Sequence, residues 1–239
     1  MSRNLNACLV CGKPLVYFHE PREMECAFCH RKFMSYACCE DGHYVCDECH
    51  EKKGLEAIKR VCLHSDSIDP IAITREIMED PYVYMHGPEH HVMVGAALLT
   101  AYRNAGGKIN LEKAMAEMFN RGKQYPGGSC GFWGCCGAAV SVGMYTSIIT
   151  EATPLTSRTW GWSNEATSRA LAKIASYGGP RCCKRNSFTA IRTAVEFTKE
   201  KTGVQMELPA SIICTFHEEN HECLHKRCPY NPDSEIPMQ

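Results

Sequence analysis

The chain has 239 residues, of which 44% are hydrophobic and 22% charged, and its formal net charge at pH 7 is −1. This balance is typical of a globular protein and gives no overall attraction to nucleic acid or membrane surfaces. No apolar run approaches the roughly 18 residues that span a bilayer, and the opening residues lack the apolar core of a secretory signal. We therefore expect a cytoplasmic protein with no membrane partner.

Cysteine is the unusual component, with 17 residues. An odd number cannot pair completely, and in a reducing compartment Cys-x-x-Cys and Cys-Cys pairs favour metal binding or redox chemistry. The cysteines divide the chain into a metal-binding module (1–64), a connector with one short helix (65–87), a helical domain (88–204) and a Cys/His-rich tail (205–239). The predicted class is α+β, mostly α, with a zinc-ribbon-like module followed by a cysteine-rich α-helical bundle.

Two Cys-x-x-Cys knuckles open the module, and the apolar stretch 14–25 between them predicts a hairpin. The knuckles supply Cys8, Cys11, Cys26 and Cys29. Each knuckle places two thiolates on one side of a tight turn, so two knuckles give a tetrahedral four-sulfur site suited to zinc. The same four thiolates could hold a single iron.

The next stretch, CCEDGHYVCDECH, supplies Cys39, His43, Cys46 and Cys49, enough for a second zinc. A cross-brace is the alternative. In it, Cys26 and Cys29 would pair with Cys46 and Cys49, while Cys39 and His43 would pair with Cys62 and His64. We favour consecutive sites because this cross-brace leaves Cys8 and Cys11 without partners. In both arrangements the metal ions are expected to be structural, because a module this small needs bound metal to stabilise its fold.

Six helices are expected after the module. Asp69-Pro70 marks the start of the connector helix, which runs to about Glu79. Apolar periodicity and flanking glycines predict helices over 88–107, 110–122, 133–150, 163–179 and 182–203, joined by short turns as in a bundle. Strands are expected in the module, with 207–216 as a further candidate.

Cysteines follow glycine pairs at two of these helix starts, in GGSCGFWGCCG and GGPRCC. A helix N-terminus and nearby cations stabilise a thiolate, and glycines let backbone amides approach an anion or a cluster sulfide. The sequence thus predicts that Cys130, Cys136, Cys182 and Cys183 converge, with Cys135 as a spare. Such a set could bind an iron–sulfur cluster or act as a dithiol/disulfide couple.

Two further groups are candidate sites, one made of histidines and one in the C-terminal tail. His86, His90 and His91 lie in MHGPEHH, where they could ligate a metal or carry protons. The tail supplies a metal set of Cys214, Cys223 and Cys228. Its final Cys-Pro is typical of iron–sulfur motifs, and a histidine added to the three cysteines would complete a zinc site. A structural clip and a functional centre both fit this tail.

Several of these segments together resemble one family. HGPEHHVMVGAALLTAYRNAGG, GGSCGFWGCCGAA, GGPRCCKRNSFTAI and ECLHKRCPY resemble a cysteine-rich family of unknown function, numbered 5714, from anaerobic bacteria and methanogenic archaea. The resemblance implies an anaerobic redox or sulfur role and a redox or radical-SAM partner protein. The family pattern maps onto Cys130 and Cys136, and Cys135 departs from it.

These patterns predict a metal-binding redox or iron–sulfur protein of anaerobic metabolism, with cysteine-dependent sulfur or electron transfer in the helical domain. The expected cofactors are zinc in the module and an iron–sulfur cluster. The alternative is a zinc-binding adaptor without catalysis. Nucleic acid is not an expected partner, because the net charge is near zero and no aromatic–basic stripe is present.

Overall fold

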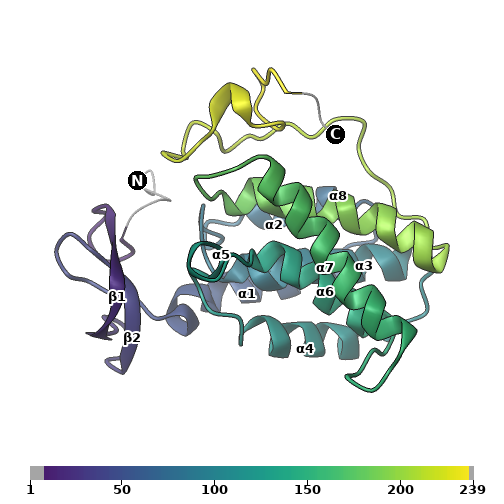
Figure 1. Ribbon diagram of the computed structural model, residues 1–239, viewed down its shortest axis with the longest axis horizontal. Coiled ribbons are helices and arrows are strands. Elements are labelled where there is room, and N and C mark those ends of the chain that lie inside the picture. Colours follow the sequence, from purple (N-terminus) through teal and green to yellow (C-terminus); the bar gives the residue numbers. More distant parts are fainter. Residues whose placement is uncertain (1–7, 237–239) are drawn as a thin grey trace.

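The structure, a computed structural model, describes residues 8–236; residues 1–7 of the predicted module and 237–239 of the predicted tail lie outside the described residues. The elements in chain order are β1 (Leu15–Glu25), β2 (Lys32–Cys39), α1 (Asp47–His64), α2 (Pro70–Glu79), α3 (Glu89–Asn104), α4 (Leu111–Gly122), α5 (Ser129–Phe132), α6 (Gly137–Ile149), α7 (Arg158–Ser176), α8 (Cys183–Thr202) and the 3-10 helix η1 (His225–Arg227). The protein is mostly helical with one two-stranded sheet. In Figure 1 the hairpin stands at one end of the helical body, and the C-terminal segment returns across that body.

The hairpin differs from the sequence prediction. Residues 15–25 form a single strand, which pairs antiparallel with β2 from Leu15 opposite Cys39 to Glu25 opposite Lys32. The turn is the second knuckle, where the amide of His30 donates to the carbonyl of Cys26 at 2.9 Å. His30 has a φ of 58° in the left-handed region, which reverses the chain there. A hairpin within 14–25 was therefore wrong.

The helical core surrounds α3, which is buried on nearly all sides and contacts α1, α2, α4, α6 and α8. Gly95 allows the close approach of α6, because a Cβ there would lie 3.0 Å from the Oγ atom of Ser141. α1 contributes Leu55, Ile58 and Cys62 to this core. The bundle therefore begins at Asp47, so the predicted module boundary at residue 64 includes one helix of the bundle.

Helix ends follow their caps. Asp69 accepts hydrogen bonds from the first amides of α2, and Gly203 ends α8 with a φ of 76°, as the sequence indicated. α6 begins at Gly137 rather than 133, so the expectation that Cys135 and Cys136 lie within the helix was wrong. Cys136 is instead the extended N-cap residue.

Three other predictions can be compared with the structure. α7 begins at Arg158, before the predicted start at 163. No strand forms over 207–216, which lies wholly within the described residues. Within residues 8–236, the helices are all too short or too polar to cross a membrane.

Candidate metal centres and a thiol-lined cleft

The hairpin places the two knuckles at opposite ends of the module. β1 has 11 residues, and an extended chain of that length spans roughly 30 Å. β2 then returns, so that Cys39 lies opposite Leu15, close to the first knuckle. The second knuckle is left at the turn, beside the start of α1.

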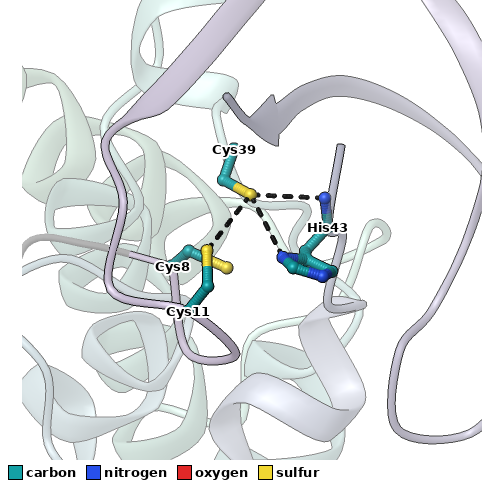
Figure 2. Close-up of side chains that lie close together, drawn as sticks. All are labelled: Cys8, Cys11, Cys39 and His43. Carbon is teal, nitrogen blue, oxygen red and sulfur yellow. Dashed lines mark hydrogen bonds between the residues drawn. The ribbon is translucent and has the colours of Figure 1, made fainter. Parts of the chain in front are cut away.

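The first group of ligands is Cys8, Cys11, Cys39 and His43, whose ligand atoms all lie within 4.8 Å of one another. The sulfurs of Cys11 and Cys39 are 3.7 Å apart, and the Cys39 sulfur is 3.5 Å from Nδ1 of His43. Two thiolates bound about 2.3 Å from one tetrahedral ion would lie roughly 3.8 Å apart. Figure 2 shows the four side chains converging. The chemistry and spacing fit a zinc-class ion.

The second group is Cys26, Cys29, Cys46 and Cys49. The sulfurs of Cys29 and Cys46 are 3.8 Å apart, and the amide of Cys46 donates to the Cys26 sulfur at 3.4 Å. Although burial opposes it, backbone amides including that of Cys46 lower the pKa of Cys26 to about 6. This environment favours a thiolate, the form that binds metal.

The prediction that the two knuckles share one metal site was wrong, because β1 holds the first knuckle and the second knuckle at opposite ends of the hairpin. The cross-brace alternative was half right. Cys26 and Cys29 do meet Cys46 and Cys49, but Cys39 and His43 meet the first knuckle. Cys62 is fully buried in the helical core, and His64 bonds the carbonyl of Arg60 at 2.8 Å.

A cleft of about 1450 Å³ separates the module from the bundle. Tyr17 and Tyr36 of the hairpin contact its far wall: the Tyr17 ring lies 5.4 Å from the Arg181 guanidinium, and the rings of Tyr36 and Phe132 are 4.5 Å apart. Hairpin and bundle therefore enclose the cleft together.

Three of the predicted cysteines line this cleft: Cys130 on α5, Cys136 at the cap of α6 and Cys183 at the start of α8. The side-chain amide of Asn186 donates to the Cys136 sulfur at 3.3 Å. Burial raises the pKa of both Cys136 and Cys183. These two groups therefore stay protonated thiols near neutral pH unless a metal binds them.

His86 bridges the cleft cysteines to the tail. Its Nε2 atom lies 2.7 Å from Oε2 of Glu222, and its Nδ1 atom accepts from the amide of Cys183 at 3.5 Å. Arg181 approaches the same carboxylate at 3.9 Å. Both ring nitrogens of His86 are thus engaged, so this histidine orients the start of α8 rather than accepting a proton from a thiol.

The other two histidines differ in position. His91 lines the cleft, its Nδ1 atom lies 3.1 Å from the carbonyl oxygen of Tyr125, and its ring packs on Gly137. His90 is 1% exposed, and its Nε2 atom lies 3.0 Å from the carbonyl oxygen of Tyr84. Burial lowers the pKa of His90 to about 4. His91 is therefore the one of these two histidines that faces the cleft, next to the start of α6.

Cys182 does not join the cleft cysteines. It lines a separate small cavity with the three tail cysteines, Cys214, Cys223 and Cys228. The predicted set of Cys130, Cys136, Cys182 and Cys183 is thus divided between two cavities. Cys135 lines neither, and its carbonyl accepts from the hydroxyl of Tyr125 at 2.7 Å.

The family of unknown function DUF5714 matches residues 58–231. The chain belongs to this family. The DUF5714 match begins within α1, after the ligands of the module, and covers the rest of the bundle, the cleft cysteines and the tail cysteines. No curated protein and no solved structure shows significant similarity to the chain.

Proposed function

We propose that this DUF5714 member is a metal-binding redox protein that transfers sulfur or electrons at the cleft cysteines. The observation that carries this proposal is that Cys130, Cys136 and Cys183 all line one open cleft, together with His91 and Arg181. The two metal groups of the module serve to hold the hairpin side of this cleft. A reducing, anaerobic cytoplasm suits 17 cysteines, none of which forms a disulfide within residues 8–236.

The chemistry assigned to the cleft is thiol exchange with a disulfide or persulfide substrate. A thiolate attacks one substrate sulfur, the substrate S–S bond breaks, and the second sulfur leaves with a proton as a thiol. A second cleft cysteine then attacks the mixed disulfide and releases the bound half. The protein leaves this cycle as a disulfide, which a dithiol reductant restores.

The roles of the cysteines follow from their surroundings. All three cleft cysteines are half-buried. Cys136 and Cys183 lie at helix starts, where burial raises their pKa, whereas Cys130 lies on the short α5 between Ser129 and Gly131. We therefore assign Cys130 as the attacking cysteine and Cys136 and Cys183 as the pair that resolves the adduct. The Arg181 guanidinium is placed to attract an anionic substrate such as a tripeptide disulfide.

The test exposes anaerobically purified protein to glutathione disulfide and follows adducts by mass spectrometry. We expect Cys130→Ser to abolish the adduct, and Cys136→Ser and Cys183→Ser to accumulate it, because resolution is lost. Cys135→Ser is the matched control, since Cys135 is a half-buried cysteine outside both metal groups and both cavities. Equal adduct formation in all four variants would refute the assignment.

A zinc-binding adaptor is the second candidate, and exposed apolar side chains on the hairpin favour it. Val16, Phe28 and Met34 are 42%, 52% and 64% exposed. Such side chains, held by two metal ions, suit a surface that docks another protein, and a redox or radical-SAM enzyme is the partner class proposed. Val16 lies outside the lining of the cleft, so substitution of Val16 by Lys would weaken capture of that partner and leave glutathione adducts unchanged if the adaptor role holds.

A further inference from the structure

The C-terminal segment returns beside the helical body (Figure 1). Together with the start of α8 it lines a small cavity. We call it the chamber. Four cysteines line it: Cys182 from the N-cap of α8, and Cys214, Cys223 and Cys228 from the tail. Because all four line the same cavity, their side chains face a common space.

Hydrogen-bond donors surround these sulfurs. Backbone amides of Arg185, Phe216 and His225 donate to Cys182, Cys214 and Cys223 at 3.4, 3.4 and 3.3 Å. The side chain of Asn220, which is 5% exposed, adds a second donor to Cys182 at 3.5 Å. Donors aimed at sulfur stabilise the thiolate over the thiol. Burial nevertheless raises the pKa of Cys182, Cys214 and Cys228, so the donors suit sulfurs whose charge a bound metal offsets.

Two buried cations line the same chamber. Lys184 is 1% exposed and Arg185 3% exposed, and neither makes an ion pair within residues 8–236. The ammonium of Lys184 makes no hydrogen bond in this part of the chain and lies 4.1 Å from the centre of the Phe216 ring. The buried carboxylate of Glu89 acts on this ammonium without pairing with it, and Arg185 donates to the carbonyls of Gly178 and Pro180 at 3.0 Å. A buried ammonium that makes no hydrogen bond or ion pair is unfavourable. Lys184 therefore suits a chamber that holds a group of net negative charge.

The sulfur spacing distinguishes between two such groups. Thiolates on one tetrahedral zinc lie roughly 3.8 Å apart. Within the described residues, the groups with three or more ligand atoms inside 4.8 Å are those of the module, so the chamber sulfurs are spread more widely. A wider ring of four thiolates, closed by Cys228-Pro229, suits a polynuclear iron–sulfur centre.

We propose that the chamber binds a four-iron, four-sulfide cluster through Cys182, Cys214, Cys223 and Cys228. The four thiols each release a proton as their sulfurs bind iron, and Lys184 and Arg185 offset the negative charge that results. This goes beyond the proposed thiol exchange, which requires only the cleft cysteines. Iron content tests the cluster, and adduct formation tests the cleft, so either proposal can fail alone.

The experiment uses the full chain, purified without oxygen and reconstituted with iron and sulfide. We expect about four irons and four acid-labile sulfides per chain, with a broad visible absorption band that bleaches on reduction. Cys214→Ser and Cys223→Ser should lose most of the iron, while Cys183→Ser, the neighbour of a ligand, should keep it. Circular dichroism establishes that the variants fold.

A second variant removes a charge and spares every ligand. Lys184→Met should shift the reduction midpoint of the cluster to a more negative potential, because a nearby positive charge favours the reduced form. Lys199→Met, an exposed lysine of the same helix, is the control and should leave the midpoint unchanged. Zinc in the chamber, or iron retained in both Cys214→Ser and Cys223→Ser, would overturn the proposal.

Discussion

The backbone amide of Gly127 donates a hydrogen bond of 2.8 Å to Oδ2 of Asp47. Asp47 directly follows the metal-group residue Cys46 and begins α1, whereas Gly127 begins the loop that carries Cys130. This single bond therefore ties the second metal group to the cleft wall.

We expect Asp47→Ala to release the loop. The free energy of unfolding should fall by about 1 kcal/mol, the usual size of one hydrogen bond, and alkylation of Cys130 should become several-fold faster. Mass spectrometry after timed alkylation measures the second effect. Glu56→Ala removes an exposed carboxylate from the same helix and is the control. Equal alkylation rates in the two variants would mean that the bond does not position Cys130.

Metal content shows which cysteines share one ion. Cys11→Ser and Cys39→Ser disturb the same group, so each single variant and the double variant should lose the same one ion from the module. Cys11→Ser combined with Cys26→Ser should lose two. The measurement is zinc per chain by elemental analysis after dialysis. A loss of two ions from the Cys11/Cys39 double variant would instead support the consecutive pairing.

Gly137 is required by a neighbouring ring. A Cβ at this position would lie 2.1 Å from Cδ2 of His91, a separation at which one of the two must shift. We expect Gly137→Ala to lower the free energy of unfolding by about 1–3 kcal/mol, as overpacking does. Gly131→Ala is the control, because a Cβ there meets nothing within 4 Å. Thermal unfolding of both variants checks the prediction, and equal melting temperatures would contradict it.

His90 should make stability depend on pH. Its pKa is lowered to about 4 by burial, below the usual value of about 6.5. Between these values the unfolded chain binds the proton and the folded protein does not, so stability is lost as pH falls from 6.5 toward 4.

His90→Gln should remove this dependence. Between pH 7 and pH 5 the parent protein should lose about 2 kcal/mol more than the variant, measured by urea unfolding. Acid release of metal affects both proteins, so the difference isolates His90. His64→Gln, at an exposed histidine of α1, should behave like the parent. A His90→Gln protein with the same pH slope as the parent would contradict the assignment.

The helices could be predicted because their signals are local. Asp69-Pro70 marks the start of α2, and Gly203 marks the end of α8. The pairing of the metal ligands in the module could not be predicted from sequence, for a geometric reason. The stretch 15–25 fits either a hairpin or one long strand, and only its pairing with β2 decides which ligands meet.

The chamber was beyond sequence reasoning as well. The sequence predicts Cys214, Cys223 and Cys228 as one metal set, and the structure shows that they line one cavity whose fourth cysteine comes from the start of α8. Nothing local in the tail shows where it returns on the bundle. Glu222 was missed for the same reason, since its partner His86 lies 136 residues away.

Cys182 and Cys183 are joined by one peptide bond and face different compartments, the first closed and the second open. If the chamber holds the proposed cluster and the cleft binds the proposed anion, their charges would act on each other across one helix start. Thermodynamic reciprocity would make this coupling symmetrical. An anion in the cleft that makes the cluster harder to reduce would then bind more weakly once the cluster gains an electron.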